Sequence, residues 1–316
     1  MASELRIGTR GSQLALFQAN WVKDQLVQTH PELKVTLIKI KTTGDKIQDV
    51  PLAKIGGKGL FVKEIEEALI QRRIDLAVHS IKDVPTEFPK SLHLSVITKR
   101  EDPRDVLISR NGTALKDLPQ GAKIGTSSLR RQAQLLHFRN DLELIPLRGN
   151  LDTRLKKLMT MNLDGIVLAL AGVKRLGLEE RISEIIPINI SLPAIGQGAL
   201  GIETRMDDRV VEDQIRFLND PHSSIAVTAE RAFLKKLEGG CQVPIAAFAQ
   251  KVGSTLQIDG LVGTIDGKRL IRHHLEGPIE EAEPLGTQLA EILLAKGAKE
   301  ILDEVYQRTN PIVEIP

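Results

Sequence analysis

A short pattern that occurs twice in the chain constrains its fold more than any other feature. Residues 7–9 and residues 124–126 both read Ile-Gly-Thr, both end a strand-like run, and both are followed by serine, arginine and a helical stretch. A serine at the start of a helix caps free backbone amides, and such amides together with a guanidinium group bind anions. One copy would indicate only a capped helix. Two copies predict two similar α/β domains that face a shared anionic ligand.

Further strand-like runs end in polar loops. The buried runs 75–78, 142–147 and 164–169 are each followed by basic residues. In open α/β sheets, ligands bind beyond the carboxyl ends of the strands, so these loops should converge on one cleft. Guanidinium groups pair bidentately with carboxylates. The arginines of these loops and of the repeated pattern therefore suit a ligand with several carboxylates: Arg10, Arg130, Arg131, Arg148, Arg154 and Arg175.

Asp83 is the acidic residue among these cations. It follows Lys82 at the end of a strand-like run. A carboxylate in such surroundings usually balances neighbouring charge in a salt bridge. Alternatively, it faces a cation that develops on the substrate and donates or accepts a proton. Both interpretations fit its position.

The composition excludes several classes of protein. Among 316 residues, 43 lysines and arginines nearly balance 41 acidic residues, and 3% of residues are aromatic. A net charge of +2 and so few aromatic side chains argue against nucleic acid as the partner. The histidines lack the spacing of zinc ligands, and no apolar run approaches membrane-spanning length. We therefore expect no metal, no membrane span and, without an apolar signal core, a cytoplasmic protein.

The first helical stretch, residues 13–28, carries apolar side chains at spacings close to the helical repeat. Leu14, Phe17, Trp21 and Leu26 can share one face. The spacing therefore indicates one apolar face on this helical stretch.

Breaks in these patterns predict the domains. Residues 101–105 separate the first α/β unit from the second, and residues 190–198 mark another crossing. Two crossings imply that the chain leaves the first domain and later returns to it, which gives hinged lobes. Beyond them, a helix, three strand-like segments and two more helices indicate a small α+β domain. The predicted domains are residues 1–99 with 199–217, residues 104–193, and residues 221–316, the last of which carries Cys241.

Cys241 is the only cysteine and follows two glycines. A lone cysteine cannot form an intramolecular disulfide, and glycines let other atoms approach closely. Taken alone, the segment fits a small buried side chain better than a reactive thiol. Covalent attachment or nucleophilic chemistry is the alternative.

The connection from Thr42 to Gly59 is longer than most loops of compact domains. Such loops are usually functional lids or solvated segments, and its glycines and lysines suggest a flap over an anion. The predicted flap residues are Lys54, Lys58 and Phe61.

Taken together, these residues resemble the porphobilinogen deaminase family in its compact bacterial form. The most specific segments are residues 77–85, 125–131 and 238–244, which read Ala-Val-His-Ser-Ile-Lys-Asp-Val-Pro, Gly-Thr-Ser-Ser-Leu-Arg-Arg and Glu-Gly-Gly-Cys-Gln-Val-Pro. The resemblance is collinear and spread over all three predicted domains. The other matching segments are residues 7–16, 56–61, 100–105, 147–150 and 192–198.

The resemblance implies an α/β fold with two lobes like those of periplasmic binding proteins around a cleft, plus a small α+β C-terminal domain. It also implies a transferase with a dipyrromethane cofactor attached to Cys241 through a thioether. Such an enzyme deaminates four porphobilinogen molecules, condenses them head to tail on the cofactor, and releases hydroxymethylbilane by hydrolysis. A monomer that passes its product to a downstream cyclising synthase would follow.

The resemblance also assigns roles to individual residues. Asp83 would stabilise positive charge on pyrrole nitrogens and assist proton transfer. The cofactor would be bound by Lys82, Asp83, Thr126, Ser128, Arg130, Arg131, Arg148 and Gly149, in addition to Cys241. The substrate would be bound by Arg10, Ser12, Gln18, Arg148, Arg154, Arg175 and Gln197.

Two other classes stay open at this point. An arginine-lined scaffold of two lobes could be an intracellular anion-binding module without catalysis. Cys241 could instead be a transient nucleophile, although no histidine lies near it in the sequence to act as its base.

Overall fold

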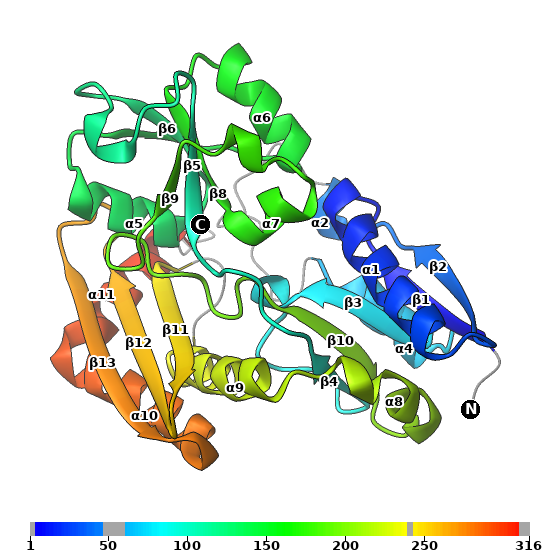
Figure 1. Cartoon of the computed structure of the whole chain (residues 1–316). Coiled ribbons are helices and arrows are strands. Elements are labelled where there is room, and N and C mark those ends of the chain that lie inside the picture. The colour runs from blue at the N-terminus through cyan, green and yellow to red at the C-terminus, as the bar shows by residue number, and fades with distance from the viewer. Residues whose placement is uncertain (1–3, 47–60, 239–242, 310–316) are drawn as a thin grey trace, which may run out of the picture.

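The computed structural model describes residues 4–46, 61–238 and 243–309. Within these ranges the strands form three separate sheets, two of five strands and one of three. Figure 1 shows the three sheets as distinct units. The first lobe is blue and cyan except for its late segment from residue 200 on, which is yellow-green, the second lobe is green, and the third unit is yellow to red. The predicted fold class, two α/β lobes plus a small α+β domain, is confirmed.

The first lobe is built on a mixed sheet with the strand order β2-β1-β3-β10-β4. Strand β1 runs parallel to β2 and β3, whereas β10 runs antiparallel to both of its neighbours. Its core is formed by aliphatic side chains of the sheet and its covering helices. The elements are β1 (Glu4–Thr9), α1 (Gln13–Thr29), β2 (Lys34–Lys39), α2 (Thr43–Lys46), α4 (Lys63–Ile70), β3 (Leu76–Ser80), β4 (Leu92–Ile97), β10 (Leu200–Arg205) and α8 (Arg209–Ile215).

The second lobe repeats this pairing pattern. Its sheet has the order β7-β6-β8-β5-β9, in which β6 is parallel to β7 and β8, and β5 is antiparallel to β8 and β9. The repeated Ile-Gly-Thr pattern thus lies on β1 and β6, the second strand of each sheet. The elements are β5 (Asp105–Ser109), β6 (Lys123–Gly125), α5 (Leu129–Phe138), β7 (Glu143–Ile145), α6 (Leu151–Thr160), β8 (Gly165–Ala169), α7 (Leu170–Arg175) and β9 (Glu184–Ile186).

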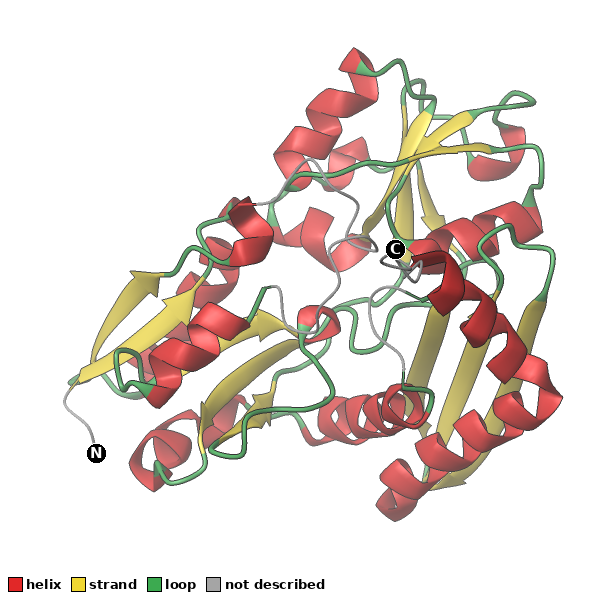
Figure 2. Ribbon diagram, turned by 180° about the vertical axis from the view of Figure 1, so that it is seen from behind, coloured by secondary structure: helices red, strands yellow, loops and turns green. Residues whose placement is uncertain are grey.

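The third unit is an antiparallel meander packed against helices. Helix α9 packs on α10 and β11 (Figure 2). Phe233 of α9 is fully buried in the core of this unit. The boundaries of the three domains stay a prediction. The elements are α9 (Pro221–Lys236), β11 (Ile245–Val252), β12 (Thr255–Gly263), β13 (Leu270–Pro278), α10 (Ala282–Leu293) and α11 (Lys299–Thr309), with Leu294–Ala298 between the last two.

Short helical turns complete the described chain. The turn that matters for the site is η1 (Ile81–Asp83), which follows β3 directly. The others are η2 (Leu115–Asp117), η3 (Glu179–Arg181), η4 (Arg216–Leu218) and η5 (Ile279–Glu281). No described helix has the length and apolar character needed to cross a membrane.

The buried face of α1 coincides only in part with the apolar face that the spacing indicates. Leu26 is fully buried, whereas Phe17 and Trp21 are 43% and 37% exposed. The buried side chains are Gln18, Ala19, Val22 and Leu26. Gln18 is buried because its amide donates a hydrogen bond to Ser80 Oγ at 3.0 Å, which satisfies the polar group inside the lobe.

Candidate active site

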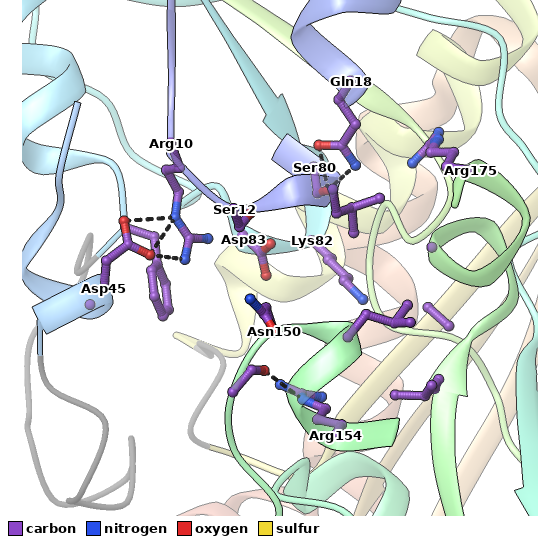
Figure 3. Close-up of a pocket in the computed structure, with 18 of the residues that line it drawn as sticks. Arg10, Ser12, Gln18, Asp45, Ser80, Lys82, Asp83, Asn150, Arg154 and Arg175 are labelled. Atoms are coloured by element: carbon purple, nitrogen blue, oxygen red, sulfur yellow. Dashed lines mark hydrogen bonds and ion pairs between the residues drawn. The ribbon is translucent and has the colours of Figure 1, made fainter. Parts of the chain in front are cut away.

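A cavity of about 720 Å³ lies between the two lobes (Figure 3). Its walls are the loops that follow β1, β3, β7 and β8, together with the segment before β10. The carboxyl ends of the parallel strands therefore converge on one cleft. The predicted site residues that line it are Arg10, Ser12, Gln18, Phe61, Lys82, Asp83, Arg131, Arg148, Gly149, Arg154, Arg175 and Gln197.

Thr126, Ser128 and Arg130 are predicted site residues that do not line the cavity. Thr126 is 2% exposed at the end of β6. Ser128 is the N-cap of α5 and accepts a hydrogen bond from the Arg131 amide at 3.4 Å. These residues therefore lie behind the residues that line the cavity and help to hold them in position. Cys241, Lys54 and Lys58 lie outside the described residues.

Arg10 on the first lobe pairs with Asp45 of α2. The Arg10 Nε donates to Asp45 Oδ1 at 3.1 Å, and the guanidinium group stacks 4.3 Å from the ring centre of Phe61. Burial alone would raise the pKa of Asp45, but the hydrogen bond and charge of Arg10 outweigh it and lower that pKa. A carboxylate ligand would therefore have to share or displace an existing partner of Arg10.

Lys82 and Asp83 occupy the turn η1 and line the cavity side by side (Figure 3). Burial lowers the pKa of Lys82 to about 8, because the negative charge of Asp83 only partly offsets desolvation and Arg131 adds repulsion. The Lys82 Nζ also donates to Gln197 Oε1 at 3.4 Å. A bound carboxylate would favour the charged form of this lysine.

Asp105 at the start of β5 binds two of the predicted arginines. It is fully buried, and its carboxylate accepts hydrogen bonds from Arg130 Nη1 at 2.8 Å and from Arg131 Nη2 at 2.7 Å. Ser191 Oγ and Gln197 Nε2 donate to the same carboxylate, each at 2.9 Å. Burial alone would raise the pKa of Asp105, but the two guanidinium groups hold it far below its usual value. Asp105 thus fixes the orientation of both arginines.

The second lobe contributes arginines whose partners are carbonyl groups. Arg154 Nε donates to Gly149 O at 2.8 Å, and Arg175 Nη2 donates to Gly198 O at 2.6 Å. Burial, followed by the charge of Arg131, lowers the pKa of Arg154 to about 10. Burial also lowers the pKa of Arg148 and of Arg175. A lowered pKa means that the charged form of a cation is poorly stabilised by its surroundings. A bound anion would stabilise these charged forms, so this wall is suited to bind anions.

Gly149 has a conformation that its neighbours require. Its φ is +114°, and a Cβ at this position would lie 2.6 Å from Thr153 Cγ2. A glycine therefore allows the Gly149 carbonyl to approach Arg154 while Asn150 caps α6 by accepting from the Thr153 amide at 3.0 Å.

Asp45 and Asp105 are site residues that the sequence reasoning missed. Asp105 ends the segment 101–105, which was interpreted as a domain crossing, and Asp45 lies in the predicted flap connection. An acidic residue directly before the apolar run of residues 106–108 is the sequence signal that could have revealed Asp105. Among the described residues, no group of three or more histidine, cysteine or acidic side chains is arranged to hold a metal ion.

Comparisons with known proteins show the family of the chain. Residues 5–213 match the porphobilinogen deaminase, dipyromethane cofactor binding domain, and residues 224–295 match the C-terminal domain of porphobilinogen deaminase. A porphobilinogen deaminase of Geobacter metallireducens is 60% identical over 305 residues, which cover 96% of each chain. The Pelobacter propionicus porphobilinogen deaminase is 57% identical, covering 96% of this chain and 98% of its own.

Solved structures with two-lobed folds give a looser likeness. The periplasmic aliphatic sulphonate binding protein SsuA of Escherichia coli has a TM-score of 0.41 at 16% identity, covering 75% of this chain and 71% of its own. The methionine binding protein MetQ has a TM-score of 0.44 at 13% identity, covering 68% and 89%. These values concern the fold alone. The family matches span both lobes and most of the third unit, and the chain therefore belongs to the porphobilinogen deaminase family, a family of transferases that carry a dipyrromethane cofactor.

Proposed function

We propose that this chain deaminates four porphobilinogen molecules, condenses them head to tail on a dipyrromethane attached to Cys241, and releases the linear hydroxymethylbilane by hydrolysis. The observation that carries the proposal is a cavity lined by several cations and by Asp83. Porphobilinogen bears two carboxylates and loses ammonia, so its conversion needs cations for binding and an anion near the reacting carbon. Family membership favours catalysis over the non-catalytic binding module.

The cavity fits the cofactor that the family carries. A dipyrromethane brings acetate and propionate groups, which guanidinium groups bind well. Arg131 lines the cavity, and its Nε is buried without a hydrogen-bond acceptor among the described residues, so this atom can still donate. When bound, the cofactor supplies the nucleophilic pyrrole carbon from which the product chain grows. Arg131, Arg148 and Lys82 would hold its carboxylates from the cavity wall.

The remaining lining residues would bind and orient the substrate. Arg10, Arg154 and Arg175 would bind carboxylates of porphobilinogen and of the lengthening chain. Ser12 and Gln18, on the same wall as Arg10, would add hydrogen bonds to neutral groups. Because three of these side chains already donate to the protein, ligand binding would exchange partners rather than order free side chains.

Asp83 would stabilise the positive charge that develops as porphobilinogen loses ammonia. An anion fixed in a partly dehydrated cavity stabilises a developing positive charge more than an anion in water does, because the surroundings need not reorganise during the reaction. The same carboxylate can accept a proton from a pyrrole nitrogen and return it.

Partners and location complete the proposal. Porphobilinogen would be the small-molecule substrate of a monomer, and a downstream cyclising synthase would receive the product. The single cysteine fits the reducing conditions of the cytoplasm.

Intact mass spectrometry with a turnover assay tests this function. The wild-type protein should carry a dipyrrole-sized adduct and consume porphobilinogen. Cys241→Ser should fold, as judged by its melting curve, but carry no stable adduct, because thioether formation needs the more nucleophilic sulfur. Porphobilinogen consumption by Cys241→Ser at the wild-type rate, without an adduct, would contradict the attachment site. A wild-type protein without adduct or turnover would contradict the function itself.

A further inference from the structure

Arg231 connects the third unit of the protein to the loop that carries Asp83. It lies on α9, and its Nη1 and Nη2 donate to the carbonyl oxygens of Val84 at 3.2 Å and Pro85 at 2.5 Å. The guanidinium group also lies 5.4 Å from the ring centre of Phe88. These contacts join residues nearly 150 positions apart in the sequence.

The two carbonyl groups belong to the residues that directly follow Asp83. The turn η1 ends at Asp83, and the Val84 amide donates to Ile81 O at 3.0 Å. Pro85 has a nearly fixed φ and restricts Val84 to extended conformations. This stretch is therefore stiff, so holding its carbonyl groups also holds the backbone of Asp83.

The hydrogen bonds of Arg231 are unusual for a half-buried arginine. Among the described residues they go to two neutral carbonyl groups and not to a carboxylate. Burial lowers the pKa of Arg231 to about 10, which shows that its charge is poorly compensated. Burying a cation without a carboxylate partner is unfavourable, so an ion pair does not explain the position of Arg231. Its planar guanidinium group can instead hold two carbonyl groups in a fixed geometry.

The preceding residue of α9, Glu230, contacts a second segment that borders the cavity. Glu230 is fully buried and accepts hydrogen bonds from the Gly196 amide at 2.6 Å and from Arg100 Nη1 at 2.5 Å. Gly196 precedes Gln197, which lines the cavity. Helix α9 therefore contacts both the Asp83 loop and the Gln197 segment, and it ends at Lys236, shortly before Cys241 in the sequence.

We propose that Arg231 is a positioning residue for Asp83: its guanidinium group binds the Val84 and Pro85 carbonyl groups and so fixes the Asp83 carboxylate relative to α9, the helix that leads to Cys241. The inference rests on the proposed function. Arg231 does not line the cavity, so it acts through Asp83 and not on the substrate.

The test compares Arg231→Gln and Arg231→Lys with the wild-type holoenzyme, with Lys235→Gln as a control on an exposed part of the same helix. The measurements are adduct mass, melting temperature, and kcat and KM for porphobilinogen. In Arg231→Gln we expect a retained adduct, a nearly unchanged melting temperature and KM, and a kcat lowered about 10- to 100-fold, since small misplacements of a reacting group have such effects. Arg231→Lys keeps the positive charge and a donor group but not the planar fork, and it should recover part of the loss.

A double-mutant cycle with Asp83→Asn separates positioning from general support of the fold. If Arg231 acts through Asp83, adding Arg231→Gln to Asp83→Asn should lower single-turnover porphobilinogen consumption only slightly further. Losses that multiply would overturn the proposal, as would a wild-type kcat in Arg231→Gln.

If Arg231→Gln does not fold, Arg231→Lys replaces it in the cycle. Losses that multiply, or a wild-type kcat in Arg231→Lys, would then overturn the proposal. Absence of turnover in the wild-type holoenzyme contradicts the proposed function. Failure of the Arg231 proposal alone leaves wild-type turnover intact.

Discussion

Replacing Asp105 with asparagine should destabilise the protein more than replacing any exposed acidic residue. Its carboxylate is fully buried and binds Arg130 and Arg131, which are 4% and 5% exposed. An asparagine side chain has one acceptor oxygen and one amino group. In the Asp105→Asn variant, that amino group would face a guanidinium donor, and two buried cations would share no anion.

The magnitude follows from this geometry. Removing one partner of a buried ion pair costs about 3 to 5 kcal/mol, because the remaining charge stays buried and uncompensated. Ser191 and Gln197 also lose a charged acceptor, which places the expected loss in the upper part of that range. The matched control is Asp102→Asn. Asp102 pairs with Arg104 nearer the surface, where a pair is worth about 0 to 1 kcal/mol.

The assay is urea denaturation of both variants and the wild type, compared in the same state of cofactor loading. Because the folded protein lowers the pKa of Asp105, its stabilisation is present above the unfolded pKa of about 3.9 and is lost as the pH falls below it. The difference between wild type and Asp105→Asn should therefore be constant from about pH 5 to 8 and shrink at lower pH. A difference below about 1 kcal/mol at pH 7, or one that grows on acidification, would refute the role of Asp105 as the shared counterion.

Two further predictions concern η1. Asp83→Asn should lower single-turnover porphobilinogen consumption about 100- to 1000-fold with little change in melting temperature; near-normal turnover would remove Asp83 from the mechanism. The pKa of Lys82 is lowered to about 8, so its ammonium group loses the proton as the pH rises through this value, and the extent of cofactor assembly on the protein should fall above it. Lys82→Arg keeps the charge and should move this fall to higher pH, whereas an unchanged pH profile would contradict the assignment.

The parts of the site that local rules govern could be predicted from the sequence. Ser12 and Ser128 both cap helices, as the repeated pattern indicates, because capping depends on residues within one turn. The clustering of Arg10, Asp83 and Arg148 follows from their positions after strands, since the carboxyl ends of parallel strands meet at one edge of a sheet.

The parts that depend on pairing between distant segments could not be predicted. Asp105 meets Arg130 across 25 positions of sequence, and no local pattern says which acidic residue a buried arginine will bind. The buried face of α1 was indicated only in part for a related reason. Which face of α1 is buried depends on Ser80, a residue 62 positions away from Gln18. Ser80 gives Gln18 a hydrogen-bond partner inside the lobe, and Trp21 lies on the exposed side of the helix.

The partners of the cavity arginines imply an order of electrostatic attraction. Arg10 and Arg131 are each paired with a carboxylate of the protein, which neutralises part of their charge. Arg154 and Arg175 donate to carbonyl groups, and the charges of Asp83 and Glu101 compensate theirs only in part. An incoming carboxylate therefore gains most from Arg154 and Arg175, because it meets a partly compensated cation and displaces no hydrogen-bonded anion. Substrate carboxylates should be drawn first to the second-lobe wall, while the carboxylate-paired arginines act chiefly as oriented donors.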